Sequence, residues 1–433
     1  MEPAGNAVGE AAPLRRNPNF RRILASQLTS TSGSAIANVC LLWIVFTTTH
    51  SALDVGLYGA AGVTGGIGFS LIGGSLVDRY DRQRLMVTAD LVRASAVGVL
   101  VVLLFLHGFT LLGIVAVAFF VAAFSMVFNP AANTLVLAIA GPSRLADANG
   151  LLGAAQSTAG FVATSVAGAF IVTVGALVGL GLNVVTFALS AMFVSSLVLP
   201  ATARRPRPGA SKAGGLLADL REGGRWLLAS PGLFQLTVSA GFFNFFSALV
   251  GSFLVVYSTE LLHGSAFVYA ALLAAETAGA GAGTLLSGRI HAARKAGRWW
   301  VVGYGCIGGL AALGVALVPV AIVAIPLFFV MGCVGGCAVN AWLTAALLVV
   351  PPEIQGRYFG IDQLGSIAII PVAQVGGGIL IGVIGVGTTY LLAGVGWCLS
   401  GFAFLPLRSL ARFGAVPGEV RPTPVATGGG TRP

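Results

Sequence analysis

The sequence predicts an all-α integral membrane protein with twelve transmembrane helices arranged as two six-helix halves. The composition is the first observation behind this prediction. Of the 433 residues, 56% are hydrophobic and only 9% are charged, whereas a soluble protein has about 25% charged residues. No soluble core could bury this much apolar surface, so the composition indicates a membrane protein.

The spacing of the apolar runs is the second observation, because crossing a bilayer takes about 20 apolar residues per helix. We expect spans at 22–48, 55–77, 85–107, 110–138, 147–173, 177–199, 233–259, 267–288, 299–318, 321–349, 358–384 and 387–410. These spans form an N-terminal half over 17–199 and a C-terminal half over 233–411. The polar tails, 1–16 and 412–433, are expected to be disordered.

The only long loop, 200–232, joins the two halves. Between Leu216 and Leu228, leucines recur at helical spacing opposite charged residues, which gives one apolar and one charged face. We interpret this segment as an amphipathic helix on the inner membrane surface. A hinge between the halves is the simpler role, and a binding site for a partner is the alternative.

Short features of the first half recur in the second. Pro18 and His50 have counterparts 213 residues later in Pro231 and His263, and glycines further along recur at an offset of 210. The sequence therefore predicts that the two halves are repeats of one six-helix plan.

The net charge of +10 reports membrane topology. Apart from Arg93, the 24 Lys and Arg residues gather in the two tails and in alternate loops, and the intervening loops contain none. Short cytoplasmic loops collect Lys and Arg, so both termini are expected in the cytoplasm. The basic residues are expected to meet anionic lipid head groups, and no nucleic-acid partner is predicted.

The turn between the second and third expected spans, GGSLVDRYDRQR at 73–84, resembles the signature loop of the major facilitator superfamily, G-x-L-x-D-R-x-G-R. The matching residues are Gly74, Leu76, Asp78, Arg79 and Arg82. Asp81 stands where the family more often has Gly. This departure resembles the exporter branch that includes macrolide efflux proteins and the enterobactin exporter.

The resemblance covers about residues 17–411 and implies a secondary transporter that rocks its two halves around a midplane cavity. It also implies a cytoplasmic gating latch in which Asp78 faces the start of the eleventh span. The residues assigned to this latch are Gly74, Asp78, Arg79, Arg82, Asp90 and Arg93.

Asp90 and Arg93 are three residues apart, so they share a helix face and can pair. A purely structural pair is the simpler interpretation, and membership of the latch is the alternative. Asp362, one turn into the eleventh span, is expected to be solvated or paired with Arg357.

Glu276 is the clearest functional candidate, because it lies midway along the eighth span with no other ionisable residue in that run. A charged side chain at the bilayer centre costs about 2.5–3.5 kcal/mol or more. Burial favours the neutral form of a carboxyl, so Glu276 could bind and release a proton near neutral pH. We hypothesise that it carries the coupling proton or meets a cationic substrate. The alternative is a permanently protonated carboxyl that is hydrogen-bonded to a neighbour.

Uncharged polar residues form stripes at helical spacing in five spans, and one such stripe alone is typically helix–helix contact. Several stripes together favour a shared wet cavity. The candidate lining residues are Gln27, Ser34, Asn38, Asn129, Asn133, Gln156, Asn244 and Asn340.

No enzyme, cofactor or metal site is predicted. The chain has no Gly-rich phosphate loop ending in Lys-Ser or Lys-Thr. Its five cysteines lie scattered in apolar spans, and Cys333 and Cys337 have no His, Asp or Glu near them in sequence. Apolar packing explains these cysteines better than a metal site does.

The resemblance to the exporter branch implies a multidrug-type efflux transporter of the cytoplasmic membrane, and a monomer is what the family resemblance leads us to expect. Its expected substrate is a small amphipathic molecule of drug, macrolide or siderophore type, exchanged for protons. One alternative is a carrier of lysophospholipid, other lipid or a small metabolite on the same fold. The other alternative is a non-transporting membrane sensor or scaffold.

Overall fold

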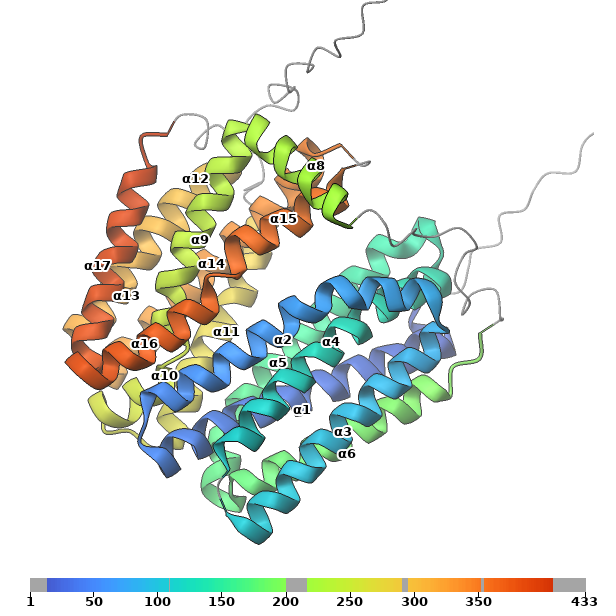
Figure 1. Ribbon diagram of the computed structural model, residues 1–433, viewed down its shortest axis with the longest axis horizontal. Coiled ribbons are helices and arrows are strands. Elements are labelled where there is room, and N and C mark those ends of the chain that lie inside the picture. The colour runs from blue at the N-terminus through green and yellow to red at the C-terminus, as the bar shows by residue number, and fades with distance from the viewer. Residues whose placement is uncertain (1–13, 109, 200–215, 290–294, 352–353, 408–433) are drawn as a thin grey trace, which may run out of the picture. The chain divides into compact units, whose positions relative to one another are not determined.

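The computed structural model describes residues 14–108, 110–199, 216–289, 295–351 and 354–407 (Figure 1). Within these ranges the regular secondary structure is entirely helical, without strands. Eleven of the described helical segments are long and apolar enough to cross a membrane. The remaining expected span, 55–77, lies in α2, a 28-residue helix at Ala52–Arg79. The predicted twelve-helix membrane fold is therefore confirmed, while the expected disorder of the tails concerns residues that lie almost entirely outside the described ranges.

The chain divides into two compact units. Unit 1 comprises Met1–Leu41 and Gly65–Ser211, and unit 2 comprises Leu42–Thr64 and Lys212–Pro433. The sequence-based halves placed 42–64 in the first half. In the structure this segment packs within unit 2 because small residues let backbones meet: a Cβ on Gly56 would lie 2.2 Å from the Gln374 carbonyl oxygen.

Unit 1 contains the blue to green helices of Figure 1. Their bounds are η1 (Leu14–Arg16), α1 (Pro18–Thr49), α2 (Ala52–Arg79), α3 (Arg82–His107), α4 (Leu111–Ala140), η2 (Pro142–Arg144), α5 (Leu145–Val174) and α6 (Ala176–Ser195). The C-terminal end of α1 and the N-terminal part of α2, within Leu42–Thr64, belong to unit 2.

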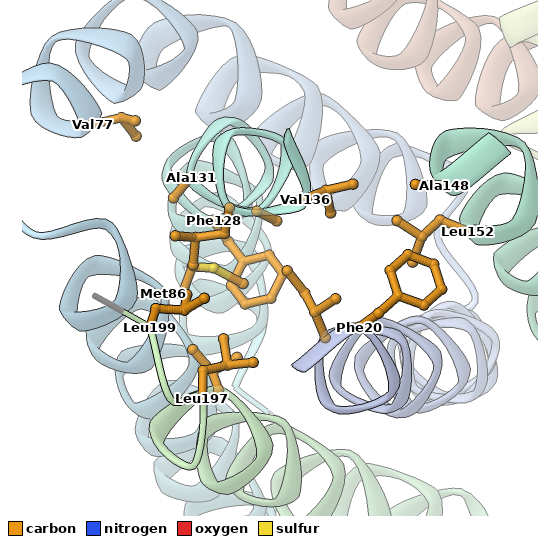
Figure 2. Packing of buried hydrophobic residues seen from close by; sticks show 14 of the residues in the cluster. Phe20, Val77, Met86, Phe128, Ala131, Val136, Ala148, Leu152, Leu197 and Leu199 are labelled. Atoms are coloured by element: carbon orange, nitrogen blue, oxygen red, sulfur yellow. The ribbon is translucent and has the colours of Figure 1, made fainter. Parts of the chain in front are cut away.

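A hydrophobic cluster holds one end of these helices together (Figure 2). Phe20 of α1, Met86 of α3 and Phe128 of α4 are each at most 2% exposed within it. The segment after α6 contributes Leu197 and Leu199. Full burial of each large side chain contributes about 1.5–3 kcal/mol relative to exposure in water, so the cluster fixes this end of unit 1.

Unit 2 contains the later helices, with two π-helical segments. Their bounds are α8 (Leu216–Ala229), α9 (Pro231–Gly251), α10 (Leu254–Val256), η3 (Tyr257–Leu261, π), α11 (Ala266–Arg289), α12 (Ala296–Arg298), η5 (Trp299–Ile307, π), α13 (Gly308–Leu317), α14 (Ala321–Val349), α15 (Gln355–Ile367), α16 (Ile370–Ile384) and α17 (Val386–Phe404). The linker segment expected to be amphipathic forms α8, which packs on α15 and α9. Trp226 of α8 meets Tyr358 of α15 with ring centroids 5.9 Å apart.

The sequence repeat is visible in the backbone. His50 and His263, 213 residues apart, both have positive φ, at 49° and 48°. Gly175 and Gly385, 210 residues apart, have φ of 91° and 80° and each separates two consecutive helices. A positive φ is uncommon for a residue other than glycine, so the matched histidines indicate that both repeats turn the chain in the same way after their first helix.

Glycines set the distance between α11 and α14. A Cβ on Gly283 would lie 1.9 Å from the Cys333 carbonyl oxygen, and one on Gly332 would lie 2.0 Å from the Glu276 carbonyl oxygen. Gly279 and Gly336 are equally close to the facing backbone. Small residues at regular spacing allow such close helix packing in membranes.

We therefore predict that Gly283→Ala destabilises the protein by about 1–3 kcal/mol, because the added methyl group must push α14 away. The control is Gly281→Ala on the same helix, where a Cβ meets no atom within 4 Å. That change should be neutral or stabilise by about 0.5–1 kcal/mol, because alanine is the better helix former. Thermal unfolding in detergent measures both. Equal effects of the two variants would contradict the close packing.

Candidate functional site

The motif turn is short and well defined. α2 ends at Arg79 and α3 begins at Arg82. Asp81 is the N-cap of α3, and its carboxylate accepts a hydrogen bond of 3.0 Å from the Arg84 backbone N–H. The residue that departs from the family pattern therefore has a structural role, because N-cap acids satisfy free N–H groups at helix starts.

The structure places the other motif residues only in part. Arg79 is exposed and Arg82 is half-buried. The backbones of Gly74 and Asp78 belong to α2, but the contacts of Gly74 and of the Asp78 side chain are outside what the structure describes. The contact expected for Asp78 at the eleventh span therefore stays a prediction.

Gln83, next to the motif, was not singled out in the sequence. It is 6% exposed, and its Nε2 lies 2.9 Å from the Val194 carbonyl oxygen and 3.1 Å from the Leu197 carbonyl oxygen, so it donates to carbonyls at the end of α6 and just after it. Helix ends leave such carbonyls without partners inside the helix. Gln83 thus ties the motif turn to the end of α6.

Asp90 and Arg93 form the expected ion pair, and the structure buries it almost completely. Asp90 is 0% exposed and Arg93 is 4% exposed. Ser190 of α6 donates to Asp90 Oδ2 at 2.6 Å, and the Ser190 and Ser26 hydroxyls lie 2.8 Å apart. The carboxylate is thus held by an arginine and a hydroxyl chain across three helices, as a buried charge requires.

The Arg93 guanidinium lies between two aromatic rings. Its Cζ is 4.7 Å from the ring centre of Phe128 and 4.6 Å from that of Phe187. Its Nη1 donates to Ser125 Oγ at 3.2 Å. Cation–π contacts strengthen when the cation is desolvated, so the two rings stabilise the positive charge of this almost fully buried guanidinium.

Beside this pair is a polar cavity of about 650 Å³ within unit 1. Its lining comes from α1, α3, α4 and α5, and three of the polar stripes in the sequence meet there. The lining residues are Gln27, Ser30, Thr31, Ser34, Arg93, Ser125, Phe128, Asn129, Asn133, Asn149, Leu152, Gly153 and Gln156. Gln156 donates to Gln27 across the cavity wall.

The chemistry of this lining is mostly neutral and hydrogen-bonding. Amides and hydroxyls can both donate and accept hydrogen bonds, and Arg93 is the one charged side chain among the described lining residues. Volumes of about 300–1,000 Å³ are typical of small-molecule pockets. The cavity could therefore hold a polar group of a small molecule.

The remaining polar candidates are placed elsewhere. Asn38 is exposed and does not line this cavity. Asn340 of α14 donates to Ser287 of α11 at 2.9 Å, which is a helix–helix contact. Asn244 of α9 lines a separate cavity in unit 2.

Glu276 lies in the middle of α11, and its side chain is partly buried. Among the described residues its carboxyl has no ion pair and no hydrogen bond, so the hydrogen-bonded alternative finds no partner there. When ionised, the Glu276 carboxylate would repel negative charge on the Tyr304 and Tyr390 side chains, which belong to the same unit. A carboxyl without a fixed partner can exchange a proton without breaking the fold.

Asp362 is not solvated, which was one of its two expected environments, and the side chain of Arg357, its other expected partner, lies outside the described residues. Asp362 is 6% exposed, and Thr237 Oγ1 donates to its Oδ1 at 2.5 Å. The burial arises because α9 covers this face of α15. The local sequence could not predict the hydrogen bond from Thr237 to Asp362, since the two residues are 125 positions apart.

Comparisons with known proteins agree with this fold. The chain is 28% identical over 222 residues to the "Multidrug efflux pump Tap" of Mycolicibacterium fortuitum, a match that covers 50% of this chain and 54% of that protein. The chain thus spans about half the length of the curated relatives it matches.

Solved transporters share the fold at low identity. A bacterial homologue of the human lysosomal transporter Spinster aligns with a TM-score of 0.63 at 16% identity, covering 91% of this chain and 98% of that one. The peptide transporter POT aligns with a TM-score of 0.70 at 13% identity, covering 93% and 99%. The family model described as Major Facilitator Superfamily matches residues 23–371. The chain therefore belongs to the Major Facilitator Superfamily.

Proposed function

We propose that this protein is a secondary active transporter that exports a small amphipathic molecule, of drug, macrolide or siderophore type, by proton antiport. The observation that carries the proposal is the unit 1 cavity, where polar faces of α1, α4 and α5 meet beside the buried Asp90–Arg93 pair. Polar side chains within a membrane span are costly and commonly functional, and here amides and hydroxyls from three helices gather around one cavity. The name of the Tap relatives supports export of drugs.

The proposal places a monomer in the cytoplasmic membrane with both termini inside the cell. The clustering of Lys and Arg in alternate loops supports this orientation. The motif turn, with exposed Arg79, would then be cytoplasmic. The proposed transport cycle involves a substrate, protons and the surrounding lipids, and we propose no cofactor for it.

Asn133→Leu tests the role of the cavity. Asn133 lines it and makes no side-chain hydrogen bond among the described residues, so leucine of similar size should leave stability nearly unchanged. A lost hydrogen bond to substrate is worth about 0.5–1.5 kcal/mol, so transport of a polar compound should weaken by about 2- to 10-fold. Uptake of labelled compounds into proteoliposomes under an imposed proton gradient measures this.

The matched control is Thr173→Val on α5, which removes a hydroxyl of the same unit that bonds to its own helix at the Ala169 carbonyl oxygen. It should transport like the wild type. If Asn133→Leu transports at the wild-type rate, the proposal that this cavity binds the substrate is contradicted. If no compound moves with any variant, the sensor and the lipid-carrier alternatives are next, and labelled lipids separate them.

A further inference from the structure

Unit 2 has a cavity of its own, of about 440 Å³, with a different chemistry. Its lining comes from α9, η5, α14, α15 and α16. Aromatic rings form one part of the wall, and a carboxylate with neutral polar groups forms the other. Asp362 is the one ionisable side chain among the described lining residues, none of which is Lys, Arg or His.

The Asp362 carboxylate is buried and has too few partners for a charged group. One hydroxyl, from Thr237, donates to Oδ1 at 2.5 Å. Among the described residues no hydrogen bond reaches Oδ2 and no cation pairs with the group. A buried carboxylate keeps its charge only when it is paired and hydrogen-bonded, so a cation on the cavity side would stabilise the charged form of this group.

Three of the neutral polar side chains of the wall already donate a hydrogen bond within the protein. Asn244 Nδ2 donates to the Ser366 carbonyl oxygen at 2.8 Å, and Ser366 Oγ donates to the Asp362 carbonyl oxygen at 2.6 Å. The Trp300 indole Nε1 donates to Ser239 Oγ at 3.0 Å. Toward a guest the wall offers the Asn244 amide oxygen, the Ser366 hydroxyl oxygen and the π-face of the indole as acceptors, and the amide of Gln363 can both donate and accept.

The aromatic part of the wall consists of three rings in contact. Trp300 and Trp342 have centroids 6.4 Å apart with an interplanar angle of 42°. Trp342 and Phe359 have centroids 5.9 Å apart at 88°. Rings inclined to each other present π-electron density from more than one direction, and tryptophan is the most favourable ring for a cation.

We propose that this cavity binds the cationic group of an organic molecule, with Asp362 as counter-ion and Trp300, Trp342 and Phe359 as a partial aromatic cage. A quaternary ammonium or a protonated amine on an apolar body matches the acceptors, the charge and the rings together. This inference rests on the proposed function, because it takes the bound cation to be a member of the transported class of molecules. Binding of the cation can nevertheless be measured without transport.

The test uses the purified full-length protein in detergent and two probes of the same shape. Benzyltrimethylammonium carries a permanent positive charge, and neopentylbenzene is its neutral carbon analogue. Equilibrium dialysis with labelled probes should show that the wild type prefers the cation. Asp362→Asn keeps the shape and the acceptor for Thr237 but removes the charge, so cation affinity should fall by about tenfold or more, with the neutral probe unaffected. Trp342→Leu should weaken cation binding by about fivefold.

The matched control is Asp54→Asn, which removes one carboxylate from the same unit outside the cavity and should bind like the wild type. Size-exclusion profiles and unfolding temperatures identify any variant that fails to fold, and Trp342→Leu then provides the test. Equal affinity for the two probes, or a folded Asp362→Asn that still prefers the cation, would overturn the proposal. If cation binding is as expected but no compound is transported, the site stands and the proposed function fails.

Discussion

Asp90→Asn is expected to destabilise the protein by about 3–5 kcal/mol, because it leaves the Arg93 charge buried without its counter-ion. Asp90 is fully buried, and Arg93 is 4% exposed between Phe128 and Phe187. Although Arg93 lines the unit 1 cavity, its side chain is only 4% exposed, so water offers little compensation for the lost counter-ion. Arg93→Met should cost a similar amount, since it leaves the carboxylate with hydrogen bonding from Ser190 alone.

The double variant Asp90→Asn/Arg93→Met should be close to the wild type, because replacing both charges removes the desolvation cost together with the attraction. Unfolding free energies in mixed detergent give the coupling, which should amount to several kcal/mol. Arg84→Met, on the exposed surface of the same helix, is the control and should change stability by no more than about 0.5 kcal/mol. If the two single effects simply add, Asp90 and Arg93 do not depend on each other.

The membrane helices and the polar stripes could be predicted from the sequence because both are local patterns. An apolar run of sufficient length specifies a span, and polar residues at every third or fourth position specify one helix face. Gln27, Asn133 and Gln156 lie on three different helices, yet each stripe indicates that its helix has a polar face, and the structure brings these three faces together around one cavity.

The depth and the partners of individual residues could not be predicted, because they depend on distant segments. The burial of Asp362 needs Thr237, and the position of Gln83 needs the end of α6, 111 or more residues later. The π-helical segment at 299–307 could not be predicted either, because its sequence has the same pattern as an ordinary apolar α-helical span. Long-range packing selects among the conformations that local propensity allows.

Glu276→Gln is expected to abolish proton movement coupled to transport. The carboxyl lies in the middle of α11, and among the described residues no ion pair or hydrogen bond fixes its charge. Placing the charge at the bilayer centre costs about 2.5–3.5 kcal/mol or more, so the group is driven to take up a proton whenever it leaves water. Glutamine has the same shape as the protonated acid but cannot release a proton, so the variant should remain in the protonated-like state.

Stability should be preserved in this variant, because no salt bridge is lost among the described residues. We expect a change of at most about 0.5 kcal/mol in unfolding free energy. The matched control is Glu260→Gln at the exposed end of η3, which removes the same charge from the same unit. That variant should couple protons and compound like the wild type.

We propose that this transporter exchanges a small molecule for protons. Proton movement in proteoliposomes that carry a pH-sensitive dye tests this most directly. A proton gradient is imposed, amphipathic compounds are added, and the wild type is compared with Glu276→Gln and Glu260→Gln. We predict compound-triggered proton flux in the wild type and in Glu260→Gln, and flux at the level of empty liposomes in Glu276→Gln. Compound movement without proton flux in the wild type, or unchanged proton coupling in Glu276→Gln, would contradict it.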